Sequence, residues 1–405
     1  MLSTPRLNWA LFIVYVLVTI GVLVAALISP TIRSLAYAPL RALILPPPRP
    51  IVVDVLYSTE KAAWITEAAR RFRGAGARLD GRPIQLELSK SGSREMYLAV
   101  LDGDARPDLI SPASTLQISL LQDLSAARTD RFKSAVVDRT DSRTCRPVLN
   151  TPVVLVAWKN RADVLWGENL GGDLWLDLHK AVTEETWEAY GHPEWGFIKF
   201  GQTNPLKSNS GFQTFLLMTY GYFDRTNGLS NDYILDPDYQ DWYREFGRNV
   251  TKFGDSTGTF MEEIVAYGPS RYDIVAVYEA TAIEHVENAV ARYGSGYGSL
   301  QIYYPPATSL SDHPFCVLKA DWVAPEEARA AQMFLDFLTS REMQELALQH
   351  GFRPVDDSIS LERPGSPFPR YAANGVQLDL TAQVEVPPGN VLNTMLELWA
   401  RTVEP

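Results

Sequence analysis

Residues Trp195–Phe215 read WGFIKFGQTNPLKSNSGFQTF, where an apolar strand pattern leads through a polar loop into an apolar helix. Ser208, Asn209, Ser210 and Gly211 stand where this helix begins. The first turn of a helix has backbone N–H groups without partners and a partial positive charge, so short side chains there let the oxygens of a ligand approach closely. We therefore expect a pocket for a small polar ligand at this turn.

Strands and helices alternate in the part of the chain that begins at Ile51. The segments in order are IVVDVLYS, a helix over Glu60–Phe72, IQLELSKS, a helix over Arg94–Leu101, and PDLISPAS. Strands joined by crossover helices predict an α/β fold, with a mostly parallel sheet covered by helices on both faces.

A region of different composition, rich in Trp and Tyr, begins with the β-rich segment Val148–Trp158 and ends near Tyr304. A second β-rich segment, FCVLKADWV, follows it, and an amphipathic helix over Pro325–His350 then stops at Gly351 as at a C-terminal glycine cap. This order predicts one domain interrupted by another, with two crossing segments and a cleft between two lobes. We assign residues 51–150 and 305–374 to lobe 1, residues 151–304 to lobe 2, and residues 375–405 to a helical tail.

The N-terminal part contains an uncharged apolar run, Trp9–Ile28, long enough at about 1.5 Å per residue to cross a hydrocarbon core of about 30 Å. We expect residues 1–29 to form one transmembrane anchor and the proline-rich residues 30–50 to form a juxtamembrane linker. A cleaved signal peptide is the alternative. Local arginine counts would place the downstream side inside, but the domain organisation favours an extracytoplasmic location.

The bulk composition limits the classes of partner. Apolar residues make up 46% and charged residues 21% of the 405 residues, as in ordinary globular proteins. The formal charge of -11, without any basic stripe, argues against a nucleic-acid partner. Cys145 and Cys316 are the only cysteines, which leaves two buried thiols or one disulfide as open alternatives and gives no metal-type cluster.

Several stretches together resemble the type II periplasmic, or extracellular, solute-binding proteins, and most closely the group similar to molybdate- and sulfate-binding proteins. The matching stretches span nearly all of Ile51–Pro354 and are LYSTEKAAWITEAARRF, SKSGSREMYLAVLDGDARPDLISPAS, TPVVLVAWKN, GQTNPLKSNSG, GDSTGTFMEEIVAYGPSRYDIVAVYE and HPFCVLKADWV with its helix up to HGFRP. The resemblance implies two lobes with a hinge, closing over a small solute that is held by helix N-termini and hydroxyl groups.

The resemblance also implies a set of ligand-binding residues at the ends of strands: Ser58, Thr59, Ser93, Ser208, Asn209, Ser210, Gly211, Tyr278 and Glu279. Each stands where a strand ends and a helix starts, the edge at which open α/β sheets bind ligands. Capping a helix is the alternative role for any one of the serines and threonines, and Tyr278 has an ordinary core role as its alternative. A Glu279 carboxylate facing the cleft would repel an oxyanion, whereas one facing elsewhere would not.

Signals for chemistry are weak in this sequence. Gly254–Gly258 matches G-x-S-x-G, but the preceding residues favour a helix rather than the strand of a nucleophile elbow, so Ser256 is expected to cap the next helix. The histidines show no metal-ligand spacing, and no nucleotide-binding glycine loop occurs. We expect no cofactor, no metal and no catalytic residue.

The sequence thus predicts a membrane-anchored, extracytoplasmic, non-enzymatic protein that captures a small polar solute, with an oxyanion as one candidate, for an ABC-type transporter permease or a sensor. A structural or accessory subunit of a membrane complex that reuses this fold is the alternative. A hydrolase built on Ser256 is a distant third.

Overall fold

The computed structural model describes residues 5–28, 48–167, 171, 173–293 and 299–403. Its contacts divide the chain into one unit of Met1–Pro50 with Asp80–Pro83, and a second unit of Ile51–Leu79 with Ile84–Pro405. In the first unit, helix α1 covers Pro5–Ile28. Among the described residues, no helix combines the length and apolarity needed to cross a bilayer, so the predicted anchor is not confirmed. Most of the predicted linker, residues 30–50, lies outside the described residues.

Lobe 1 is built around a six-stranded sheet in the order β2-β3-β1-β4-β13-β5. Strand β1 pairs in parallel with β3 and β4, whereas β13 runs antiparallel to β4 and β5. The strands are β1 (Ile51–Ser58), β2 (Arg78–Leu79), β3 (Arg82–Ser91), β4 (Leu109–Ser111), β5 (Cys145–Pro147) and β13 (Pro314–Val317). The helices are η1 (Thr59–Lys61), α3 (Ala62–Gly74), α4 (Ser93–Asp102), α5 (Thr115–Ala127), α13 (Pro325–Leu338) and α14 (Arg341–Gln349).

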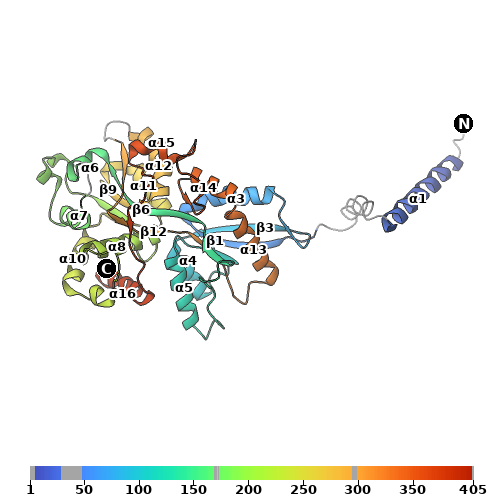
Figure 1. Cartoon of the computed structure of the whole chain (residues 1–405), viewed down its shortest axis with the longest axis horizontal. Helices are drawn as coiled ribbons and strands as arrows, with labels where there is room; N and C mark the ends of the chain where they lie inside the picture. Colours follow the sequence, from blue (N-terminus) through green and yellow to red (C-terminus); the bar gives the residue numbers. More distant parts are fainter. Residues whose placement is uncertain (1–4, 29–47, 168–170, 172, 294–298, 404–405) are drawn as a thin grey trace. The chain divides into compact units, whose positions relative to one another are not determined.

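The alternation of side chains along β1 places helices on both faces of this sheet. Val53 and Val55 pack into one core with α3 and α13, whereas Leu56 packs into another core with α4 and α5. Figure 1 shows α4 beside β1, in agreement with their contacts. The predicted α/β arrangement of lobe 1 is therefore present.

Lobe 2 is built around a seven-stranded sheet with the path β10-β6-β9-β7-β8, to which β12 and β14 add by pairing with β6. The strands are β6 (Leu149–Trp158), β7 (Phe200–Thr203), β8 (Lys252–Gly254), β9 (Ile274–Tyr278), β10 (Leu300–Tyr303), β12 (Leu310–Ser311) and β14 (Arg353–Pro354). The main helices are α6 (Lys159–Leu165), α7 (Leu174–Thr183), α8 (Asn209–Tyr222), α9 (Asn231–Ile234), α10 (Pro237–Asn249), α11 (Thr257–Tyr267) and α12 (Glu279–Tyr293). This sheet is mixed rather than mostly parallel, because the long strand β6 runs antiparallel to its partners β9 and β10.

Successive side chains of strand β6 point to opposite faces of the sheet, so the strand separates two cores in lobe 2. Val153 and Leu155 pack with α7, α8 and α10, whereas Val154 and Val156 pack with α11 and α12. The helix α8 is buried over nearly its whole length, and its buried residues include polar ones such as Gln213 and Thr214 as well as its apolar side chains.

The chain crosses between the lobes at neighbouring points. One crossing leads from β5 to β6 through Val148, and a second leads from β12 to β13 through Asp312 and His313. These two crossings lie side by side, since the N–H of Val148 donates to the carbonyl of Asp312 at 3.3 Å. A third crossing, which the sequence did not predict, leads from α14 to lobe 2 through β14. Next to the first two crossings, Cys145 on β5 and Cys316 on β13 form a disulfide, which decides the question that the sequence left open.

Two predicted boundaries differ from the structure. The expected helix over Pro325–His350 is broken into α13 and α14, with Ser340 at the N-cap of the second helix. The sequence assigned residues 305–374 to lobe 1, but Ile359 and Phe368 pack into the lobe 2 core beside α11 and α12. The short helix α15 (Pro367–Arg370) belongs to this returning segment.

The C-terminal tail packs against both lobes. Strand β15 (Ala382–Gln383) pairs with β11 (Ala307–Thr308), and helix α16 (Gly389–Thr402) follows. Helix α16 contacts α9 and α10 of lobe 2 and α5 of lobe 1, and Figure 1 shows it beside α10. Its apolar side chains, including Trp399, belong to a core that continues through both lobes.

Candidate functional site

Asn209, in the first turn of α8, joins the two lobes directly. Its Oδ1 accepts hydrogen bonds from Ser114 Oγ and Gln117 Nε2 of lobe 1, each at 2.8 Å. Its Nδ2 donates to Tyr278 OH at 2.8 Å and lies within 3.3 Å of Ser311 Oγ. Asn209 is only 1% exposed, so it acts in this closed arrangement as a bridge between lobes rather than as an open ligand contact.

A cluster of hydroxyl groups lies beside Asn209. Ser210 Oγ lies 2.6 Å from Thr203 Oγ1 and 2.7 Å from Thr257 Oγ1, and Ser208 Oγ lies 3.3 Å from Thr257 Oγ1. We call Thr203, Ser208, Ser210 and Thr257 the hydroxyl cluster. All four members are buried, and they come from the end of β7 and from the starts of α8 and α11.

The serines of this cluster do not serve as ordinary helix caps. Ser208 occupies the N-cap position of α8, yet its side chain makes no capping hydrogen bond. The same is true of Ser256 at the N-cap of α11. The helices α8 and α11 therefore both start at the hydroxyl cluster, and in neither helix does the N-cap side chain bond to the first turn. Their partly positive N-termini lie beside the hydroxyl groups of the cluster.

Gly211 has a packing role that the sequence did not reveal. A Cβ at this position would lie 2.0 Å from the carbonyl oxygen of Thr203. Glycine is therefore required so that α8 can approach the end of β7, and this close approach brings Ser210 to Thr203.

Lobe 1 faces the cluster through Thr59. Its hydroxyl is buried and has no hydrogen-bond partner among the described residues. A Cβ at Gly258, in the first turn of α11, would lie 3.6 Å from this hydroxyl, so Thr59 and α11 are close neighbours across the lobe boundary. An orphaned buried hydroxyl next to a helix N-terminus is an available donor for a bound ligand.

Ser93 starts α4, and the first turn of that helix meets lobe 2 as well. The N–H of Arg94 donates to the carbonyl of Lys207, next to Ser208, at 3.4 Å. The hydroxyl of Ser93 accepts from the N–H of Ala113 at 3.0 Å within lobe 1. The structure thus brings the starts of α4 and α8 together, although the Ser93 hydroxyl is used locally.

Ser58 belongs to a buried charged network. Its Oγ donates to Glu60 and accepts from Lys61 Nζ at 2.7 Å, and Lys61 also donates to the carbonyl of Ser111 at 2.8 Å. Burial lowers the pKa of Lys61 to about 8. Burial, together with the positive charge of Lys61, lowers the pKa of His313 to about 4. Burial opposes ionisation of Glu60, but the His313 ring, 3.2 Å away, and the Lys61 charge hold its pKa near 2.

Tyr278 and Glu279 are adjacent in sequence but belong to different networks of contacts. Tyr278 OH accepts from Asn209 and so lies in the inter-lobe network, and burial raises its pKa. Glu279 instead forms a buried bidentate ion pair with Arg353, at 2.8 and 2.7 Å, and accepts from Tyr304 OH. Its oxygens contact none of the other predicted ligand residues, so the repulsion of an oxyanion that the sequence raised does not apply.

The residues directly before Ser256 form a strand, whereas the sequence predicted a helix there. A strand, β8, does precede this serine, and α11 follows it, so the strand–turn–helix context is present. The Ser256 Oγ lies 2.7 Å from Thr259 Oγ1. Over the described residues, no histidine or acid contacts Ser256, and no group of three or more His, Cys, Asp or Glu could hold a metal.

Thr203 and Thr257 belong to the hydroxyl cluster but were not among the residues predicted from the sequence. Thr257 stands within the G-D-S-T-G segment at the start of α11, and Thr203 ends the strand before the SNSG turn. The available signal was the short strand Lys252–Gly254, which would have placed Thr257 at the same sheet edge as Ser208.

A protein-family model described as "Bacterial extracellular solute-binding protein" matches residues 53–353. The chain belongs to this family. A search of curated proteins finds no match. Family membership agrees with the two-lobed type II binding-protein fold described above.

Solved structures of this fold are similar to the chain. The sulfate-binding protein SubI from Mycobacterium tuberculosis H37Rv is 19% identical with a TM-score of 0.53, over 87% of this chain and 98% of that one. A periplasmic thiamin binding protein is 13% identical with a TM-score of 0.55, over 87% and 96%. The periplasmic binding protein AfuA from Actinobacillus pleuropneumoniae, with fructose-6-phosphate bound, is 12% identical with a TM-score of 0.55, over 87% and 99%. These likenesses concern the fold alone.

Proposed function

We propose that this chain is an extracytoplasmic solute-binding protein that holds a small oxyanion between its lobes, at the hydroxyl cluster. The observation that carries the proposal is the meeting of Ser208 and Ser210, at the start of α8, with Thr257, at the start of α11. The unpartnered hydroxyl of Thr59 supplies a donor from the other lobe.

The chemistry of this cluster favours an anion over a cation. Hydroxyl groups and helix N-termini offer donors and positive partial charge to oxygen atoms. Among the described residues that form the cluster there is no carboxylate, and the nearby Glu279 is neutralised by Arg353. Sulfate and a phosphate ester occur in the names of two proteins with similar folds, which supports testing tetrahedral oxyanions first.

Binding would act through the equilibrium between open and closed lobes. In the closed form, Asn209 bonds to Gln117, and Lys207 accepts from Arg94 across the lobe boundary. A solute enters when these contacts break and then stabilises closure by contacting donors on both lobes. The ligand must therefore bind the closed state more tightly than the open one.

A thermal-shift screen of the full chain tests this function. Sulfate, phosphate, molybdate and a sugar phosphate are the anionic probes, and thiamin is the cationic comparison. A ligand at a hundred times its dissociation constant stabilises the folded state by about 2.7 kcal/mol. Stabilisation by a tetrahedral anion at millimolar concentration or below supports the proposal, and the absence of any shift over the whole panel contradicts it.

Delivery to an ABC-type permease, and attachment to a membrane through residues 1–29, are further parts of the proposal. The family description supports an extracellular setting. Fractionation of cells that express the full chain tests attachment: recovery with membranes after a high-salt wash supports it, and recovery in the soluble fraction contradicts it.

A second candidate function is that of an accessory subunit of a membrane complex with an idle cleft. The direct lobe contacts at Asn209 and the packing of α16 against α5 and α10 favour it, because they hold the lobes together without a solute. Stoichiometric co-purification with integral membrane subunits, combined with no response in the ligand screen, would select this function over the first.

A further inference from the structure

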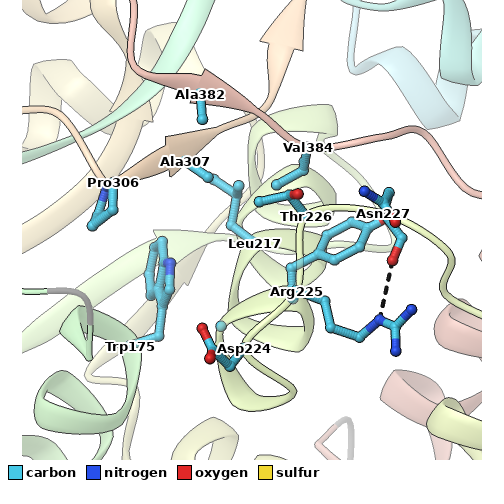
Figure 2. A pocket seen from close by; sticks show the side chains of 12 residues that line it. Trp175, Leu217, Asp224, Arg225, Thr226, Asn227, Pro306, Ala307, Ala382 and Val384 are labelled. Atoms are coloured by element: carbon cyan, nitrogen blue, oxygen red, sulfur yellow. Dashed lines mark hydrogen bonds between the residues drawn. The ribbon is translucent and has the colours of Figure 1, made fainter.

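A cavity of about 560 Å³ lies in lobe 2, outside the inter-lobe site. It is lined by α7, the C-terminal part of α8, the loop that follows α8, and the strands β11 and β15 (Figure 2). None of the hydroxyl cluster lines it. Its volume is within the range of about 300–1,000 Å³ that is usual for small-molecule sites.

Asp224, on the wall of this cavity, is unfavourable at its position in two respects, its backbone conformation and its charge. Its N–H donates to Gly221 and the next N–H, of Arg225, donates to Tyr220, which is the pattern of a helix C-terminal cap at the end of α8. Asp224 has φ of 47° in this cap, a conformation in which glycine is favoured over any residue with a side chain. Its carboxylate also stands at the negative end of the α8 dipole, where a cation would be favoured instead.

The carboxylate of Asp224 is exposed to solvent and has no ion-pair partner among the described residues. No described side chain forms an ion pair or a hydrogen bond with Asp224. The adjacent Arg225 is engaged elsewhere. Its Nε donates to the carbonyl of Asn227 at 3.2 Å (Figure 2), and its Nη1 donates to Tyr233 OH at 2.6 Å. Locally unfavourable choices of this kind are expected mainly at functional sites.

The rest of the cavity wall combines aromatic and aliphatic side chains with the polar residues Arg225, Thr226 and Asn227. Trp175, Leu217 and Val384 contribute buried or nearly buried side chains, and Figure 2 shows the indole of Trp175 at the same end of the cavity as Asp224. A Cβ at Gly221 would lie 2.5 Å from Trp175 Cδ1, so the glycine permits the close packing of this ring on α8. A tryptophan face beside a carboxylate is a suitable environment for an organic ammonium group.

We propose that this cavity is a second ligand site, which takes a small amine with an apolar body. The ammonium group pairs with Asp224 beside the Trp175 ring, and the hydrocarbon part packs against Leu217 and Val384. This ligand class differs in charge from the oxyanion proposed for the inter-lobe site, so the two sites are distinguishable in one sample.

Isothermal titration of the full chain with 2-phenylethylamine, and with its neutral analogue 2-phenylethanol, tests the proposal. The amine is expected to bind at least about tenfold more tightly than the alcohol, because only the amine forms a charged hydrogen bond. Asp224→Asn keeps a residue that tolerates positive φ and removes the charge, and it is expected to abolish this preference.

Two further variants make the result specific. Asp224→Gly restores the residue favoured at a helix cap, so it is expected to be at least as stable as the parent and still to lose the amine preference. Glu188→Gln removes an exposed carboxylate of lobe 2 that does not line the cavity, and it should leave binding unchanged. Equal affinity for amine and alcohol, equal effects of Asp224→Asn and Glu188→Gln, or no binding of the amine at millimolar concentration would each overturn the proposal.

Discussion

The side-chain oxygen of Asn209 accepts a hydrogen bond from Gln117 Nε2 at 2.8 Å, and this bond ties α8 of lobe 2 to α5 of lobe 1. The nitrogen of the same amide donates to Tyr278 OH, so both the oxygen and the nitrogen of the Asn209 side chain form hydrogen bonds in this buried network. The lobes thus close through a side chain at the helix start that was expected to hold a ligand.

Replacing Asn209 with Ala should loosen closure. The change leaves Gln117 and Tyr278 without their partners in a buried place, which costs about 1–3 kcal/mol for each group left unsatisfied. We expect a lower melting temperature and faster amide hydrogen exchange in the first turn of α8. The control, Asn249→Ala, removes an exposed amide at the end of α10 and should change stability by less than about 0.5 kcal/mol. Equal effects of the two variants would contradict the bridging role.

The ion pair between Glu279 and Arg353 should be costly to break from one side. Arg353→Met leaves a buried carboxylate, so we expect the free energy of unfolding to fall by about 3–5 kcal/mol in a denaturant titration. The double variant Glu279→Leu with Arg353→Met should recover a large part of that loss. A double variant as unstable as the single one would show that the pair does more than neutralise its own charges.

The disulfide between Cys145 and Cys316 should stabilise lobe 1. It closes a loop with a sequence separation of 171 residues, and its loss in Cys145→Ala with Cys316→Ala should cost about 2–5 kcal/mol. Reduction of the parent protein should lower its free energy of unfolding by a similar amount and so lower its melting temperature. The melting temperature of the double variant should not respond to the reductant. A reductant-sensitive double variant would contradict this assignment.

The contribution of His313 to stability should be lost when the solution is acidified from pH 6.5 to pH 4. Burial, with the charge of Lys61, lowers the pKa of His313 to about 4, while an unfolded histidine titrates near 6.5. The unfolded state therefore binds this proton first, and the loss amounts to about 3 kcal/mol over that interval. Glu60, with a pKa of about 2, adds a further loss as pH falls from about 4.5 toward 2.

The variant His313→Asn isolates the histidine contribution. His313 has φ of 38°, which asparagine tolerates, so the backbone of the crossing segment is preserved. Relative to the parent, the variant should lose less stability between pH 6.5 and pH 4, and its loss below pH 4 should also be smaller, because the His313 ring helps to hold the pKa of Glu60 low. A profile parallel to that of the parent would exclude His313 as the titrating group.

The alternation of strands and helices was sufficient to predict the α/β fold, because periodicity is a local property. The two lobes were predicted from the region between Val148 and Tyr304 that interrupts the first domain, and from the resemblance to solute-binding proteins. The mixed character of the lobe 2 sheet was not predictable in this way, since the direction of β6 depends on the crossing between lobes. The packing of α16 was likewise beyond the sequence, because its contacts come from α5, α9 and α10, which are far apart along the chain.

The candidate site was predicted in part. The SNSG turn indicated Ser208 and Ser210, whose hydroxyls the structure brings to Thr257. Glu279 was assigned a ligand role because it follows the end of a strand. Its partner, Arg353, lies 74 residues away and pairs with it only through the fold, so the sequence did not reveal the ion pair. Asn209 and Ser58 showed the limit of local patterns, since buried partners determine what their side chains bind.

Anion titration of the full chain, with and without Ser210→Ala, tests the central claim most directly. The parent should bind a tetrahedral oxyanion such as sulfate, and Ser210→Ala should weaken binding at least about tenfold, because one hydrogen bond to a charged group contributes about 1.5–3 kcal/mol. Ser270→Ala, which removes an exposed hydroxyl of lobe 2, should leave the affinity unchanged. Affinity that is the same in the parent and in Ser210→Ala would contradict an oxyanion site at the hydroxyl cluster.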